Sequence, residues 1–127
     1  MLRLGEDMTP DHPSVAPIIV TALMGAADFA WADGLRRAHF PPERNHIPAH
    51  ISLLHHLPPA RFDELVRMLR NLAAGPAPAA RLSQVMPLGR GVAFRVDSPD
   101  LLAMREDIVE AFAHDLIPQD QGTPRLH

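Results

Sequence analysis

The sequence contains no cysteine among its 127 residues. This absence excludes disulfides, thiolate nucleophiles and cysteine-ligated zinc sites together. The sequence also has no apolar run long enough to span a membrane, and its first residues lack the basic start and apolar centre of a signal peptide. We therefore expect a cytoplasmic protein that has no membrane partner.

An excess of positive charge is also lacking, because the formal net charge is -3. A protein that coats long stretches of nucleic acid needs many cationic side chains on one face, so the charge balance argues against that class. It leaves open a small phosphorylated substrate or an RNA end. Glycine-rich loops that bind phosphates or dinucleotides are missing as well, and we predict no cofactor.

The residues that are present indicate one globular domain. Hydrophobic residues make up 46% of the chain and charged residues 21%, which is typical of a soluble protein with a core. Residues 1–16 are polar and broken by proline, so we predict a flexible N-terminal arm there and a single domain over 17–127.

Hydrophobic spacing and proline positions predict the order of the elements. The first strand should be a central one, buried on both faces, because it is β-branched and almost wholly apolar. Strands interleaved with helices imply an α/β or α+β layered domain. The expected strands are 17–23, a strand from His50, 81–88 and 92–96, with the first residues of a further strand at 125–127; the expected helices are 26–38, 62–72 and 99–113.

Five of the eight histidines lie between His39 and His56. His50 begins an expected strand, and side chains on a strand alternate between its two faces. His50 and Ser52 therefore point one way, while Ile51 and Leu53 point the other. One face suits a core, and the other places an imidazole beside a hydroxyl, the pair of groups that phosphate chemistry needs.

Metal binding is the competing interpretation of these histidines. His46 and His50 have the spacing of zinc ligands on a helix, but Pro48 between them prevents that helix. His55 and His56 are neighbours on a strand, so they point to opposite faces and cannot chelate as a pair. We therefore predict no metal site, and a histidine-ligated metallohydrolase is the third of three functional hypotheses.

The loop before His50 has two interpretations. As structural residues, Phe40 would cover the apolar contacts of the preceding helix, and Arg36, Arg37 and Arg44 would be solvated. As site residues, the aromatic ring could stack on a base while the guanidinium groups hold phosphates. Both interpretations stay open on the sequence alone.

Residues 40–54 resemble the first signature of the two-histidine phosphoesterases, the superfamily that contains the 2'-5' RNA ligase-like proteins and the cyclic phosphodiesterases. The hallmark of that superfamily is a histidine, an apolar residue and then threonine or serine. It occurs twice, each copy on a central strand of one of two pseudo-symmetric lobes. His50-Ile51-Ser52 matches the first copy, and Arg125-Leu126-His127 resembles the approach to the second. Residues 89–99 are also similar to bacterial members.

The resemblance implies an α+β fold, with a two-lobed β-sheet core and helices packed on its outer faces. The second hydroxyl residue of the motif would lie two positions beyond His127. We therefore expect the second lobe, and the domain over 17–127, to be incomplete at the C-terminus.

The resemblance also implies a metal-independent phosphodiesterase that acts on the 2',3'-cyclic phosphate of nucleotides or RNA ends. His50 and His127 would be general base and general acid, in an order that the sequence leaves open. Ser52 would hydrogen-bond a phosphate oxygen, and the possible substrate contacts are Phe40, Arg44 and Arg125. The expected partner is a small cyclic nucleotide or an RNA terminus. The alternative is a degenerate member that binds a nucleotide or RNA end without turnover.

Overall fold

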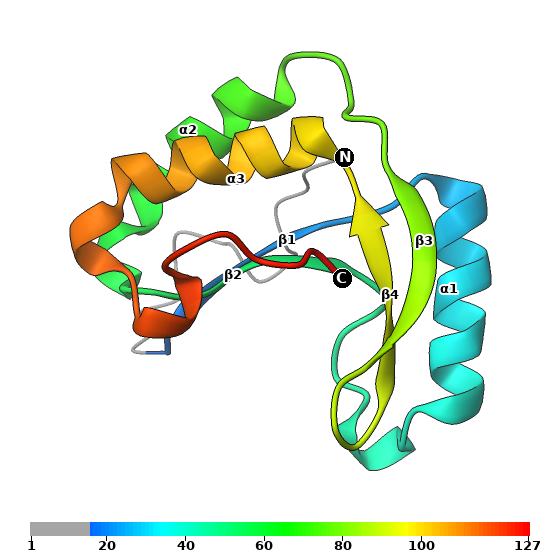
Figure 1. Ribbon diagram of the computed structural model, residues 1–127. Helices are drawn as coiled ribbons and strands as arrows, with labels where there is room; N and C mark the ends of the chain where they lie inside the picture. The colour runs from blue at the N-terminus through cyan, green and yellow to red at the C-terminus, as the bar shows by residue number, and fades with distance from the viewer. Residues whose placement is uncertain (1–15) are drawn as a thin grey trace.

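The computed structural model describes residues 16–127, so the predicted arm over residues 1–16 lies outside the described residues except for Ala16. Within the described part, three α-helices accompany two antiparallel two-stranded sheets (Figure 1). The predicted α+β class is confirmed. The two small sheets are consistent with a two-lobed core whose second lobe is incomplete.

The first sheet pairs β1 (Ile18–Ala22) with β2 (Ile51–Leu57) in antiparallel fashion. The prediction that β1 is a central strand buried on both faces is wrong. Within residues 16–127, β1 pairs with β2 alone, and the side chain of Ile19 is 51% exposed. A run of β-branched residues favours a strand but does not reveal how many neighbours the strand has, because that depends on pairing with distant residues.

The second sheet is a hairpin of β3 (Arg81–Pro87) and β4 (Val92–Asp97), which correspond to the strands predicted at 81–88 and 92–96. The turn between the strands closes where the backbone N–H of Leu88 donates to the carbonyl oxygen of Gly91 at 2.7 Å. Gly89 has a φ of 86°, a left-handed conformation that glycine adopts without steric cost. The glycines at this turn therefore allow the tight connection between β3 and β4.

The helices are α1 (Ala26–His39), α2 (Phe62–Ala73) and α3 (Pro99–Ala111), and each lies within a few residues of its predicted range. Helix α1 packs beside the hairpin, where the rings of Trp31 and Phe94 have centroids 5.1 Å apart. None of the helices described over residues 16–127 combines the length and the apolar composition that crossing a membrane would need.

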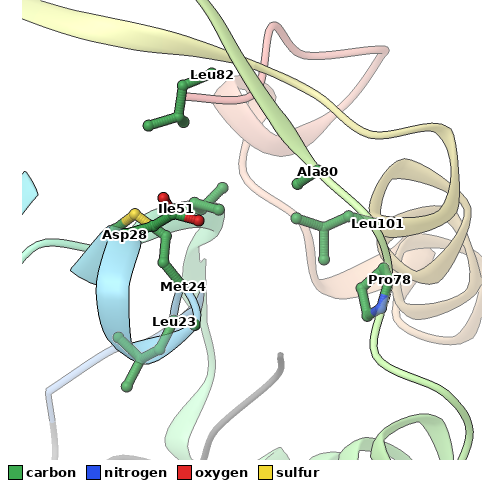
Figure 2. Close-up of a pocket in the computed structure, with 9 residues that line it drawn as sticks. Leu23, Met24, Asp28, Ile51, Pro78, Ala80, Leu82 and Leu101 are labelled. Carbon is green, nitrogen blue, oxygen red and sulfur yellow. The ribbon is translucent and has the colours of Figure 1, made fainter.

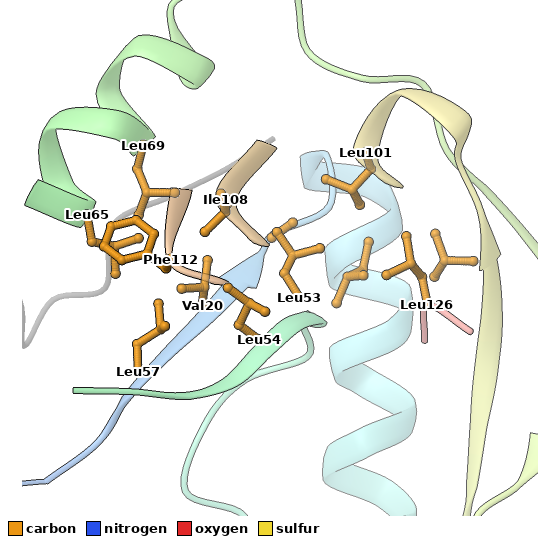
Figure 3. Packing of buried hydrophobic residues seen from close by; sticks show 13 residues of the cluster. Val20, Leu53, Leu54, Leu57, Leu65, Leu69, Leu101, Ile108, Phe112 and Leu126 are labelled. Carbon is orange, nitrogen blue, oxygen red and sulfur yellow. The ribbon is translucent and has the colours of Figure 1, made fainter. Parts of the chain in front are cut away.

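The core lies between the first sheet and the helices α2 and α3, which run side by side along it (Figure 1). Figure 3 shows their apolar side chains directed toward those of the strands. Burial of these side chains fixes which face of β2 points inward. The residues at the centre of this contact are Val20, Leu53, Leu54, Leu57, Leu65, Leu69, Ile108 and Phe112.

The C-terminal segment (residues 123–127) connects the two sheets, although it has no regular secondary structure. The backbone N–H of Ser52 on β2 donates to the carbonyl oxygen of His127 at 3.1 Å. The backbone N–H of Val96 on β4 donates to the carbonyl oxygen of Leu126 at 2.8 Å. The segment predicted as the start of a strand therefore lies between β2 and β4 (Figure 1) and is bonded to both, without being a strand itself.

Candidate active site

The start of β2 shows the alternation of faces that the sequence predicts. Ile51 is 4% exposed and Leu53 is 1% exposed, so both point into the core. His50 and Ser52 are half-buried. The regular strand begins at Ile51, one residue later than predicted, and His50 immediately precedes it. Strand periodicity therefore puts an imidazole and a hydroxyl on the face opposite Ile51 and Leu53 at the start of β2.

His127 reaches the same region from the other end of the chain. Its carbonyl oxygen accepts the Ser52 N–H, so its backbone lies directly beside β2. The imidazole of His127 is also close enough to that of His50 to affect its protonation electrostatically. The two histidines that the resemblance singles out are thus brought together by contacts between segments far apart in sequence.

Both imidazoles are held in the same local arrangement. The Nδ1 atom of His50 lies 2.8 Å from the carbonyl oxygen of Pro48, and the Nδ1 atom of His127 lies 2.9 Å from the carbonyl oxygen of Arg125. A carbonyl oxygen can only accept, so each Nδ1 must carry the hydrogen. Each neutral ring then has its unprotonated nitrogen at Nε2. Each ring is therefore anchored through Nδ1, and Nε2 is the nitrogen that this contact leaves for a substrate.

Helix α1 fixes the loop that precedes His50. A carboxylate oxygen of Asp33 accepts the backbone N–H of Ala49 at 2.9 Å, which holds the residue next to His50. The Nε atom of Arg36 donates to the side-chain oxygen of Asn45 at 2.8 Å. The guanidinium of Arg36 also lies over the ring of Phe40, 4.1 Å from its centroid. Phe40 is therefore covered on one face by a cation of its own chain.

The surroundings of His50 favour its neutral form. Burial is the largest cause that lowers the pKa of this imidazole below its usual value of 6.5, because desolvation penalises the charged ring. The hydrogen bond to the Pro48 carbonyl acts in the opposite direction. The nearby charges of Arg36, His127 and His55 lower the pKa further. The net result is a histidine that stays unprotonated, and hence able to accept a proton, at lower pH than an isolated imidazole.

The predicted substrate contacts occupy different positions. Phe40 is half-buried beneath Arg36, whereas Arg44 and Arg125 are exposed. Arg125 precedes His127 by two residues, and its carbonyl oxygen anchors that imidazole. The cation whose charge acts on His50 is Arg36, which the sequence named only as a residue with two open interpretations.

Asp33 and Asp120 are site-supporting residues that the sequence did not point to. The Asp33 carboxylate accepts a hydrogen bond from the backbone N–H of Ala49, sixteen positions away. The Asp120 carboxylate accepts hydrogen bonds from the backbone N–H groups of His55 and His56 on β2. Nothing in the local sequence pattern marks an aspartate that bonds so remote a backbone group. Within residues 16–127 no three histidine or acidic side chains are grouped so that they could hold a metal ion.

A pocket of about 150 Å³ lies on the other side of β2 (Figure 2). Ile51 lines it, and Ile51 points away from the face that carries His50 and Ser52. The remaining lining is mostly apolar, with Asp28 as its charged member. This pocket is therefore separate from the histidine pair. Its other lining residues are Leu23, Met24, Gly25, Pro78, Ala80, Leu82 and Leu101.

The chain was compared with family models, curated proteins and solved structures. The family model of the 2'-5' RNA ligase superfamily matches residues 25–127, a range that includes both histidines and Ser52. No curated protein and no solved structure gives a significant match.

Proposed function

Since this chain belongs to the 2'-5' RNA ligase superfamily, we propose that it is a phosphodiesterase that opens the 2',3'-cyclic phosphate of nucleotides or RNA ends without a metal ion. The observation that carries the proposal is the matched anchoring of His50 and His127. Each ring donates from Nδ1 to the carbonyl two residues earlier, which leaves Nε2 for a substrate. Two imidazoles so prepared can take and give a proton in one reaction.

In the proposed mechanism His50 is the general base and His127 the general acid. The lowered pKa of His50 supports its role, because a base must be unprotonated at the working pH. His50 takes a proton from water as the water oxygen bonds to phosphorus. The bond between phosphorus and one ribose oxygen breaks, and His127, protonated at Nε2, gives its proton to that oxygen. The product is a nucleoside monophosphate with a free ribose hydroxyl.

Ser52 is the proposed phosphate ligand. Its side chain lies on the same face as His50, and its backbone is bonded to that of His127. A hydroxyl at this place can donate to a non-bridging phosphate oxygen, on which negative charge grows in the transition state. Ser52 would therefore stabilise the transition state more than the bound substrate.

Arg36 and Phe40 are the proposed contacts for the rest of the nucleotide. The charge of Arg36 acts on His50, so it also acts on an anion bound there. One face of Phe40 is covered by Arg36, and stacking of a base is therefore proposed for its other face. The exposed guanidinium groups of Arg44 and Arg125 would hold further phosphates of an RNA end.

The test is hydrolysis of nucleoside 2',3'-cyclic phosphates by the purified chain in excess chelator, followed by chromatography of the products. We expect turnover that the chelator does not change. Activity that disappears with chelation and returns with added metal would instead support the metallohydrolase hypothesis. Nucleotide binding by calorimetry without any turnover would support the alternative of a non-catalytic protein that binds nucleotides or RNA ends.

A further inference from the structure

A buried arginine on α3 donates hydrogen bonds both to β2, just after His50 and Ser52, and to the loop that leads to His127. Arg105 is 1% exposed, and its Nε atom donates to the carbonyl oxygen of Leu53 on β2 at 2.8 Å. Its two terminal nitrogens donate to the carbonyl oxygens of Asp120 at 2.7 Å and Gly122 at 3.2 Å. Leu53 follows Ser52 directly, while Asp120 and Gly122 lie in the loop that leads to His127.

A buried aspartate in the same loop provides a second link to β2. Asp120 is 0% exposed, and its carboxylate accepts the backbone N–H groups of His55 and His56, at 2.9 Å and 3.0 Å for the shortest contacts. The Nδ1 atom of His55 lies 2.9 Å from the same carboxylate. The loop is therefore joined to β2 at two places, once through a cation and once through an anion.

Buried charged groups restrict the arrangements that the surrounding backbone can adopt. A buried charge is costly unless hydrogen bonds satisfy it, so the guanidinium and the carboxylate each require their particular backbone partners. The rigid fork of donors on Arg105 matches three carbonyl oxygens at once, which a lysine ammonium cannot reproduce.

We infer that Arg105 and Asp120 are positioning residues, which hold the segment carrying His127 in register with the strand start carrying His50. Their hydrogen bonds described above do not involve the imidazoles of His50 and His127. They act instead by setting where His127 lies relative to Ser52. The kinetic part of this inference rests on the proposed function, whereas the geometric part stands without it.

The geometric part is tested by a pair of titrations followed by NMR. His127→Gln should change the pKa of His50 in the parent protein, because the two imidazoles interact. The same substitution should leave that pKa nearly unchanged in an Arg105→Lys or Asp120→Asn background, where the segment has lost its register. This readout needs no activity, so it decides the inference even if the parent hydrolyses no cyclic phosphate.

The kinetic part is tested on the same variants with a nucleoside 2',3'-cyclic phosphate. A displacement of about 1 Å at a catalytic group can lower a rate about 100-fold, so we expect kcat to fall by about that factor while KM changes little. Leu69→Ala is the matched control. It weakens the core between α2 and the first sheet and touches neither link, so kcat and the coupling of the two histidines should both survive.

Two results would overturn the inference. One is an unchanged interaction between His50 and His127 in folded Arg105→Lys and Asp120→Asn proteins. The other is an equal loss of kcat and coupling in Leu69→Ala, which would mean that any loss of stability has this effect. If Arg105→Lys does not fold, Asp120→Asn decides, since it keeps the side-chain shape and one acceptor oxygen while replacing the other acceptor by an NH2 group.

Discussion

The backbone N–H of Ser52 donates to the carbonyl oxygen of His127 at 3.1 Å. This bond places the backbone of His127 directly beside that of Ser52. Strand periodicity puts the side chain of Ser52 on the same face as that of His50, which lies two residues earlier in the chain. One hydrogen bond thus joins the first motif to a segment from the far end of the chain.

Replacement of His50 should abolish most of the proposed activity. General acid–base catalysis by one positioned side chain contributes about 10²- to 10⁴-fold, so His50→Gln should lower kcat by a factor in that range. Glutamine keeps a polar side chain of similar length but cannot exchange a proton at neutral pH. The measurement is initial-rate hydrolysis of a nucleoside 2',3'-cyclic phosphate.

His56→Ala is the control for that substitution. His56 is exposed near the end of β2, and Asp120 accepts its backbone N–H, which alanine retains. We expect unchanged kcat in this variant. Full activity in His50→Gln would remove His50 from the mechanism.

Two substitutions of Ser52 should show how much its hydroxyl group contributes to kcat. Loss of one donor to a developing negative charge lowers kcat about 100-fold, and this is our expectation for Ser52→Ala. Ser52→Thr keeps the hydroxyl, and threonine has a high propensity for β-strands, so this variant should retain most of the rate. Equal rates for Ser52→Ala and the parent would show that the hydroxyl does not contact the transition state.

The helices were predicted more accurately than the strands, for a physical reason. The apolar spacing of α2 and the Ser98-Pro99 start of α3 are local signals, because a helix forms its hydrogen bonds within itself. The place of β1 at an edge of its sheet depends on which distant strand pairs with it. Short sequence windows carry no record of that pairing, and the prediction of a central strand failed accordingly.

The sequence likewise predicts the local features of the candidate site but not its long-range contacts. The common face of His50 and Ser52 follows from the period of a strand, so the sequence predicts it. The contacts of Asp33 with Ala49 and of Arg105 with Leu53 join residues far apart in the chain. A helical pattern that counts apolar residues also cannot anticipate that α3 buries an arginine.

The pH dependence should respond to Arg36. Its positive charge disfavours the protonated form of His50, so Arg36→Gln should raise the pKa of that imidazole toward 6.5. The acidic limb of kcat/KM should move to higher pH in the same direction. Titration of the imidazole by NMR and a pH–rate profile measure the two effects.

Arg70→Gln is the matched control, because Arg70 is exposed on α2 and does not contribute to the pKa of His50. The lowered pKa has a further consequence for folding in the parent. As the pH falls, the unfolded chain binds a proton at His50 near pH 6.5, whereas the folded protein binds it only at lower pH. Between the pKa of His50 in the folded protein and its value of 6.5 in the unfolded chain, this group therefore makes the free energy of unfolding rise with pH. A pKa of His50 that is identical in Arg36→Gln and the parent would contradict the assigned electrostatic contact.

Stability should depend on the side chain that begins α3. The Ser98 hydroxyl accepts the backbone N–H of Leu101 at 3.1 Å and donates to the carbonyl oxygen of Ala79 at 2.6 Å, so it caps the helix and also bonds the segment before β3. Ser98→Ala removes both bonds at a buried position, and we expect a loss of about 1–2 kcal/mol in the free energy of unfolding. Ser98→Thr preserves the hydroxyl and should stay close to the parent. Urea titration followed by circular dichroism measures the difference, and an alanine variant as stable as the parent would show that α3 does not need this cap.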